Sequence, residues 1–176
     1  MHFERLRTDE DSRYLAALTL YKSSFPFHEQ RNAKSQSEIM SHEEYHFNLL
    51  YDGTDFIGLL LCWETEHFIY VEHFCVNPEQ RNKKYGARAL ELLNQPEKKV
   101  ILEIDPPMDE NSVRRKGFYE RAGYQANNYE HIHPPYHRGY DGHRLVVMSW
   151  PSRLTDDEIQ AFGRYLQKRV MAAQMN

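Results

Sequence analysis

Residues 74–87 read FCVNPEQRNKKYGA and pass from an apolar strand pattern through a basic loop into a helix pattern. The start of a helix leaves backbone N–H groups without partners and carries a partial positive charge. The small residues Gly86 and Ala87 would let a ligand come close to that backbone. The loop adds three basic side chains, Arg81, Lys83 and Lys84. This pattern predicts a site for phosphate or pyrophosphate; the alternative is a solvated basic turn before an ordinary helix.

The residues before this stretch predict most of a sheet. Strands are expected at residues 2–7, 45–51, 56–63 and 68–76. Asp52-Gly53 predicts a hairpin, because both residues tolerate positive φ. A helix is expected at residues 9–24, and residues 28–37 indicate a loop or a broken second helix. The expected apolar face of the first helix consists of Tyr14, Leu15, Leu18 and Tyr21.

The residues after the basic loop alternate between helix and strand patterns. Helices are expected at about 83–94, at 109–122 and after Thr155, and strands at 100–104 and 144–150. Core packing is expected for one face of the last helix, with a dimer contact as the alternative: Ile159, Phe162, Leu166 and Val170. This order predicts one α+β domain over residues 1–176. Its sheet would be mixed and mostly antiparallel, with about six to seven strands flanked by helices and an extra C-terminal helix.

Composition excludes several function classes. The net charge of −4 argues against a nucleic-acid partner or a polybasic membrane contact. No run approaches the roughly 20 apolar residues of a membrane-spanning helix, and the charged start lacks a secretory pattern. Cys62 and Cys75 lie in strand patterns, where buried free thiols are commoner than a disulfide, although a disulfide is possible. We therefore expect a cytoplasmic protein that contacts neither nucleic acid nor membrane.

Two motifs in sequence order carry a family resemblance. Val76-Asn77-Pro78 ends a strand pattern, and residues 81–86 (Arg-Asn-Lys-Lys-Tyr-Gly) open a helix. Residues 117–124 read GFYERAGY and place Tyr119 five residues before Tyr124. Together these motifs resemble those of the GNAT superfamily of acyl-CoA-dependent N-acyltransferases. The resemblance extends over essentially the whole chain and implies a GNAT-like fold.

The resemblance has one departure and one extension. Lys84 stands where the first glycine of the family motif is usual; a positive φ there would strain a lysine but would leave its amide in place. The chain also resembles a bacterial branch of the family with Ser-Phe-Pro…Glu-Gln-Arg near the front, Leu-Glu-x-x-Pro in the fifth strand and Pro-Pro-Tyr before the last. The corresponding residues are 24–31, 102–106 and 134–136.

The resemblance implies a site for acetyl-CoA, used as a co-substrate, between the fourth and fifth strands. Backbone groups of Phe74, Cys75 and Val76 would bind the pantetheine and polarise the thioester carbonyl. The pyrophosphate would lie on the loop and the helix start, at Arg81, Asn82, Lys83, Lys84, Tyr85, Gly86 and Ala87.

Catalysis requires a base for the amine and an acid for the leaving thiolate. The resemblance makes Tyr119 the acid; packing against its aromatic neighbours is the alternative. Glu72, inside an otherwise apolar strand, is the first candidate for the base, with an ordinary outward-facing strand residue as the alternative. His73 is the second candidate, since a regular strand puts it on the opposite face unless a bulge intervenes. Glu103 is a third, and a relay through water remains open.

The acceptor pocket and metal content are predicted separately. The loop after the first helix and the segment before the last strand would frame the acceptor, which nominates Phe25, Glu29, Arg31, Glu103 and Tyr136. Glu29 would hold a cationic amine and Arg31 a carboxylate, with surface positions near a bend as the alternative. No metal is expected, because a predicted loop with Pro134-Pro135 interrupts the four clustered histidines, His131, His133, His137 and His143.

The sequence therefore predicts an N-acetyltransferase that moves an acetyl group from acetyl-CoA to a primary amine of a small molecule or peptide. Direct transfer would occur in a ternary complex. The alternative is a catalytically silent acyl-CoA-binding module that acts as a sensor or interaction partner, which the Lys84 departure favours. Either a monomer or a homodimer is compatible with the sequence.

Overall fold

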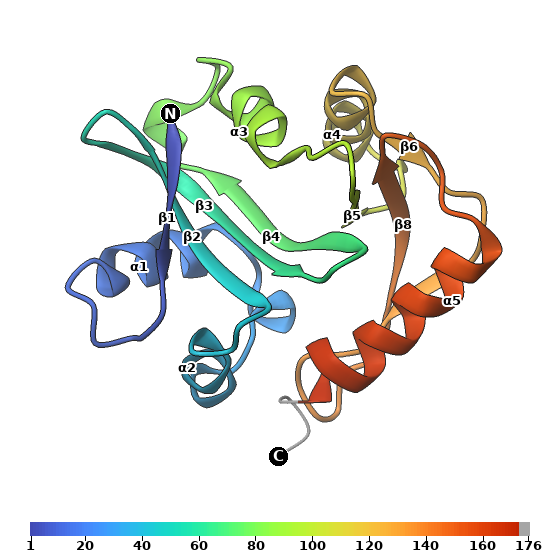
Figure 1. Cartoon of the computed structure of the whole chain (residues 1–176), viewed down its shortest axis with the longest axis horizontal. Helices are drawn as coiled ribbons and strands as arrows, with labels where there is room; N and C mark the ends of the chain where they lie inside the picture. The colour runs from blue at the N-terminus through green and yellow to red at the C-terminus, as the bar shows by residue number, and fades with distance from the viewer. Residues whose placement is uncertain (173–176) are drawn as a thin grey trace.

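The central feature of the structure, a computed structural model that describes residues 1–172, is a mixed sheet (Figure 1). Its eight strands within those residues are β1 (His2–Leu6), β2 (Tyr45–Asp52), β3 (Asp55–Glu64), β4 (Phe68–Val76), β5 (Lys99–Ile104), β6 (Gln125–Ala126), β7 (His131–His133) and β8 (His143–Trp150). The strand order is β1-β2-β3-β4-β5-β8-β6, with β7 also paired to β8. The pair β4–β5 is parallel and the other pairs are antiparallel.

Helices cover both faces of this sheet (Figure 1). They are α1 (Tyr14–Ser24), α2 (Ala33–Met40), α3 (Tyr85–Leu93), α4 (Glu110–Arg121) and α5 (Asp156–Tyr165), which a π-helical turn, Leu166–Val170, continues. One buried cluster joins α1, α2 and α5 to one face, and a second joins α3 and α4 to the other. Short 3-10 turns, η1 (Phe27–Glu29) and η2 (Pro78–Gln80), follow α1 and β4. No helix within residues 1–172 is long and apolar enough to cross a membrane.

Most predicted elements are confirmed, because local patterns determine them. Gly53 takes a φ of 61° in the hairpin between β2 and β3. Asp109 caps α4 through the backbone N–H of Ser112, and Gly123, with a φ of 88°, follows the end of that helix. The C-terminal helix packs on the core, where Phe162 and Leu166 are buried. Cys62 and Cys75 are buried free thiols.

Two details of the predicted first helix are wrong. The first helix begins at Tyr14, because Asp11 accepts hydrogen bonds from the backbone and guanidinium of Arg13 and holds the preceding residues in turns. Its buried face contains Ala17 instead of the predicted Leu15, which is 73% exposed. The predicted mixed, mostly antiparallel sheet is confirmed; its main order holds seven strands, and the short β7 pairs with β8 as an eighth.

Strands β4 and β5 separate halfway along their length. Their parallel pairing runs from Phe68↔Lys99 to Val71↔Leu102 and includes no later residue. At this point β4 also contains a bulge, because Cys62 pairs with Val71 whereas the preceding residue, Leu61, pairs with His73. Glu72 is thus the extra residue of β4. A bulge bends its strand, which accounts for the divergence from β5.

Candidate active site

A cleft of about 560 Å³ occupies the gap between the diverging strands. It is lined from both sides of the sheet, by residues of η1 and the segment after β7 on one side and by Tyr119 of α4 on the other. The predicted coenzyme residues Phe74, Cys75 and Val76 line it beyond the last β4–β5 pair. The divergence therefore leaves this part of β4 without β5 as a hydrogen-bonding neighbour.

The bulge places Glu72 and His73 on the same side of the sheet. Both side chains line the cleft, and both contact the cluster that contains α1 and α2, Glu72 through Trp63 and His73 through Tyr21. In a regular strand, successive side chains point to opposite faces. The extra residue removes that alternation, as the sequence analysis allowed.

Glu72 forms a buried ion pair with Arg31. The distance from Arg31 Nη2 to Glu72 Oε1 is 2.6 Å, and each side chain is 1% exposed. Trp63 Nε1 and the hydroxyl of Tyr136 also donate to this carboxylate, each at 2.9 Å. Burial by itself would raise the pKa of Glu72, but Arg31 and the neighbouring donors hold it below its ordinary value.

These contacts correct two expectations. A carboxylate whose two oxygens are already occupied and whose pKa is lowered is a poor acceptor for the proton of an amine, so the geometry argues against Glu72 as the base. Arg31 was expected to bind a carboxylate of the acceptor, but it is buried, pairs with Glu72 and donates to the carbonyl of Val170 at 3.0 Å. Long-range pairing of this kind leaves no signature in the local sequence.

Glu103 is the centre of a second buried polar network. It accepts hydrogen bonds from the hydroxyl of Tyr70, at 2.5 Å, and from Nε2 of His131. His133 Nε2 lies 3.9 Å from Glu103 Oε2, the same oxygen that accepts from Tyr70. Burial by itself would raise the pKa of Glu103, but these partners hold it below its ordinary value. Glu103 lines the cleft as predicted, yet its carboxylate is already engaged.

His133 is a functional candidate that the sequence analysis missed as a base. It lines the cleft, and its Nδ1 lies 2.6 Å from the carbonyl oxygen of Pro134. Because a carbonyl only accepts, Nδ1 carries a proton. His133 is 4% exposed, and its Nε2 has no hydrogen-bond partner among residues 1–172. The available signal was the spacing of His131 and His133, which puts both on one face of a strand.

His73, the second candidate for the base, is differently placed. Its Nε2 lies 2.9 Å from the backbone carbonyl of Glu29 and therefore donates its proton there. Burial lowers the pKa of His73. Its ring packs edge-on against Phe25, with centroids 4.7 Å apart. These contacts tie the bulge of β4 to the segment after α1.

Tyr119 lines the cleft from the α3–α4 side of the sheet. Its side chain is 9% exposed and packs against Phe118 and Tyr124, with ring centroids 5.0 and 5.8 Å apart. Burial raises the pKa of Tyr119 to about 12, so the hydroxyl keeps its proton at neutral pH. Tyr119 therefore packs against its aromatic neighbours and also lines the cleft, and its role as the acid stays a prediction.

The basic loop adopts an unusual backbone conformation. Asn82 and Lys84 have φ values of 64° and 61°, so Lys84 takes the left-handed conformation in place of a glycine. Lys84 is also the N-cap of α3, and no side chain caps that helix. The loop side chains Arg81, Asn82, Lys83 and Lys84 are exposed, and Tyr85, Gly86 and Ala87 form the first turn of α3. An uncapped helix start beside exposed cations fits a pyrophosphate.

Not all of the residues expected to bind the acceptor lie at the cleft. Phe25, Glu29 and Tyr136 line the cleft on the η1 side. Burial raises the pKa of Glu29. Tyr136 uses its hydroxyl to hold Glu72 and leaves its ring beside the cleft. Arg31 instead is buried and forms an ion pair with Glu72.

Comparison with known proteins gives a consistent result. The family model for the acetyltransferase (GNAT) family matches residues 12–124. A Bacteroides thetaiotaomicron protein assigned to the GNAT family is 29% identical, with 97% of this chain and 98% of that chain covered and a TM-score of 0.90. An aminoglycoside 6′-N-acetyltransferase complexed with coenzyme A is 14% identical, covers 85% of this chain and 96% of its own, and has a TM-score of 0.59.

A Bacillus subtilis acetyltransferase in complex with coenzyme A is 12% identical, with 84% of this chain and 96% of that chain covered and a TM-score of 0.53. No curated protein matches this chain in sequence. The family match spans the first helix, the basic loop and the Tyr119–Tyr124 motif, and it includes the part of the cleft lining that lies before residue 125. The chain belongs to the GNAT family of acetyltransferases.

Proposed function

We propose that this enzyme transfers an acetyl group from acetyl-CoA to a primary amine of a small molecule or peptide, directly and within a ternary complex. The observation that carries the proposal is the cleft itself, which is lined from both faces of the sheet. Acetyl-CoA would be held from the α3 and α4 side and the amine from the η1 side. Direct transfer requires that both substrates reach one point between β4 and β5.

The residues fit acetyl-CoA as a substrate. Uncapped backbone N–H groups at the start of α3, together with Arg81, Lys83 and Lys84, would hold the pyrophosphate. The β4 residues 74–76, which have no β5 partner, would hold the pantetheine and stabilise negative charge on the thioester oxygen. The thioester supplies the activated acetyl group.

His133 replaces Glu72 as our candidate for the base. An alkyl amine resembles lysine and is mostly protonated at neutral pH, so a proton must be removed before attack. The deprotonated amine then attacks. Its nitrogen becomes positively charged as the C–N bond forms, and Nε2 of His133, which has no hydrogen-bond partner among residues 1–172, accepts this second proton. As the C–S bond breaks, the hydroxyl of Tyr119 gives its proton to the departing thiolate. The carboxylate of Glu103, 3.9 Å from His133, stabilises the resulting imidazolium.

Two measurements on one protein preparation test this function. Acetyl-CoA should raise the melting temperature, because a ligand that binds only the folded state stabilises it. Thiol release should then be measured across a panel of polyamines, aminoglycosides and peptides with free N-termini. We expect release with at least one class of amine. The absence of a thermal shift with every acyl-CoA tested would contradict the proposal.

The change His133→Asn should lower kcat by about 10²-fold, since general base catalysis typically contributes at least that much. Asparagine keeps a donor close to Nδ1 and removes the basic nitrogen. The KM for acetyl-CoA should stay unchanged, and the remaining rate should rise with pH as more of the amine is deprotonated. His137→Asn is the matched control, because His137 lies outside the cleft lining. Equal kcat values for the two variants would exclude His133 as the base.

A further inference from the structure

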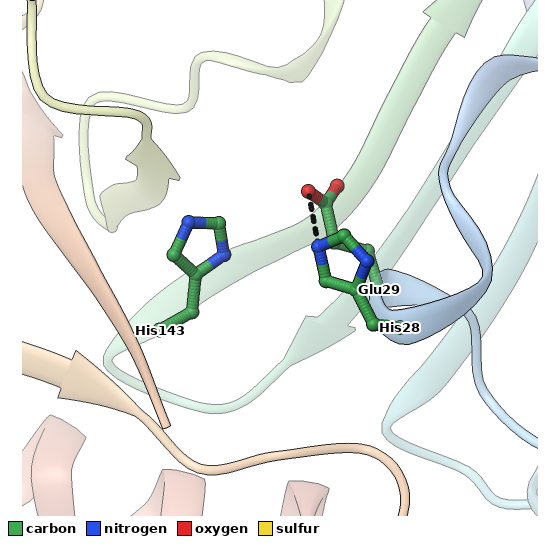
Figure 2. A group of neighbouring side chains, drawn as sticks. All are labelled: His28, Glu29 and His143. Carbon is green, nitrogen blue, oxygen red and sulfur yellow. Dashed lines mark ion pairs between the residues drawn. The ribbon is translucent and has the colours of Figure 1, made fainter. Parts of the chain in front are cut away.

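His28, Glu29 and His143 gather at the mouth of the cleft (Figure 2). Each offers one ligand atom, and these atoms lie within 4.8 Å of one another. His28 and Glu29 come from η1, whereas His143 begins β8. His28 Nε2 already lies 3.6 Å from Glu29 Oε1. Two imidazoles and one carboxylate from distant parts of the chain are therefore brought together by the fold.

The His143 ring is oriented as metal-binding histidines usually are. Figure 2 shows that the ring nitrogen next to its attachment point, Nδ1, faces His28 and Glu29. The other nitrogen, Nε2, lies 3.6 Å from Asp105 Oδ1. Asp105 is itself held by Arg115, at 2.6 Å from Nη1 to Oδ2. A carboxylate that accepts a hydrogen bond from the second ring nitrogen fixes the tautomer and strengthens the first nitrogen as a ligand, and a small rotation of Asp105 would form that bond.

The backbone around the three residues is also held in place. The carbonyl of Glu29 accepts a hydrogen bond from His73 Nε2 on β4, at 2.9 Å. The 3-10 turn closes through the N–H of Glu29 to the carbonyl of Pro26, at 2.9 Å. His143 is the first residue of a strand that pairs with both β5 and β7. Ligands on fixed elements lose less freedom when an ion binds.

Small side-chain movements would complete a coordination sphere. Zinc-to-nitrogen and zinc-to-oxygen bonds of about 2.0–2.2 Å in a tetrahedron put the ligand atoms about 3.4 Å apart. The three side chains are each between 33% and 47% exposed, so rotation about their side-chain bonds has room to shorten the longer separations. Three protein ligands leave a fourth position open, which is the arrangement of zinc sites that also bind water or substrate.

We propose that His28, Glu29 and His143 bind one divalent ion of the zinc class at the mouth of the cleft. Imidazole nitrogens with a single carboxylate suit Zn²⁺, Co²⁺ and Ni²⁺ better than Ca²⁺ or Mg²⁺. The sequence analysis expected no metal because it weighed only the histidines between 131 and 143. The structure adds two ligands from residues 28–29, which lie far away in the chain. The bound ion would join η1 to β8 across the entrance for the acceptor.

The proposal is tested by metal binding to the full chain purified without a histidine tag. Zn²⁺ should bind with one ion per chain in competition with a chromophoric chelator. Co²⁺ should give the visible absorption of a four-coordinate site. Zn²⁺ should also raise the melting temperature, since it binds only the assembled site. These readouts do not require acetyl transfer, so they are independent of the proposed function.

Variants identify the ligands. His28→Ala and His143→Ala should each weaken Zn²⁺ binding by at least 100-fold, and Asp105→Asn should weaken it about 10-fold through His143. His137→Ala is the matched control, because it removes a nearby imidazole that is not part of the group. The melting temperature of each variant without metal shows whether it folds. The proposal is overturned if no ion binds stoichiometrically, or if His137→Ala weakens binding as much as His143→Ala does.

Discussion

Replacing Tyr119 by phenylalanine should lower turnover by about 10²–10⁴-fold, equivalent to about 3–5 kcal/mol in activation free energy. The hydroxyl is the only atom group removed, and it belongs to a buried side chain that lines the cleft with its proton retained. Without this hydroxyl, the thiolate leaves unprotonated or takes a proton from water. Steady-state kinetics with a fixed amine acceptor measure the loss, and the KM for acetyl-CoA should change little.

Tyr124→Phe is the matched control for Tyr119. Tyr124 belongs to the same aromatic cluster, but its hydroxyl donates to Asn94 Oδ1 at 2.9 Å and the residue does not line the cleft. Its loss should leave kcat within about threefold of the parent, since it touches no reacting group. If Tyr119→Phe keeps full turnover while binding acetyl-CoA normally, another group protonates the thiolate.

Replacing Arg31 by methionine should destabilise the protein by about 3–5 kcal/mol, because it leaves Glu72 as an unpaired charge in the interior. The pair connects the segment between η1 and α2 to the bulge of β4, and Arg31 also donates to the carbonyl of Val170. The same change should therefore disturb the cleft. Denaturant unfolding at neutral pH measures the free energy of unfolding.

The double variant Arg31→Met/Glu72→Gln separates charge from packing. The glutamine carbonyl can still accept from Trp63 Nε1, and its NH2 group can donate to the hydroxyl oxygen of Tyr136, so the double variant should recover much of the loss. A loss below about 1 kcal/mol in Arg31→Met would mean that water or another cation replaces the guanidinium.

The contribution of Glu72 to the free energy of unfolding should change with pH in opposite directions in the parent protein and in Arg31→Met. In the parent, the lowered pKa of Glu72 contributes stability above the unfolded pKa, and this contribution disappears as pH falls through the folded pKa. In Arg31→Met, burial without a cation raises the folded pKa of Glu72. The free-energy cost of burying the charged Glu72 is then present at neutral pH. This cost shrinks as the pH falls and Glu72 becomes protonated. The difference in unfolding free energy between the proteins should therefore narrow toward acidic pH.

Local chemistry in the sequence was sufficient for the fold and for one half of the site. Alternation in β2, β3 and β4 and the cap of α4 need only near neighbours in the chain. The basic loop was predictable for the same reason, and so was the strain at Lys84, because a family motif with a glycine there marks a backbone turn. Tyr119 could be placed near the end of α4 because Gly123 follows that helix and marks where it stops.

The chemistry of the acceptor side was decided only by tertiary structure. A single bulged residue turned Glu72 toward Arg31, 41 positions away, and changed a candidate base into half of a buried ion pair. The proton position on His133 depends on one carbonyl, and the grouping of His28 and Glu29 with His143 depends on where β8 begins. Side chains acquire these roles from partners that sequence distance does not reveal. The sequence by itself therefore determined the family and the basic loop before α3, while long-range packing decided which titratable groups are already paired.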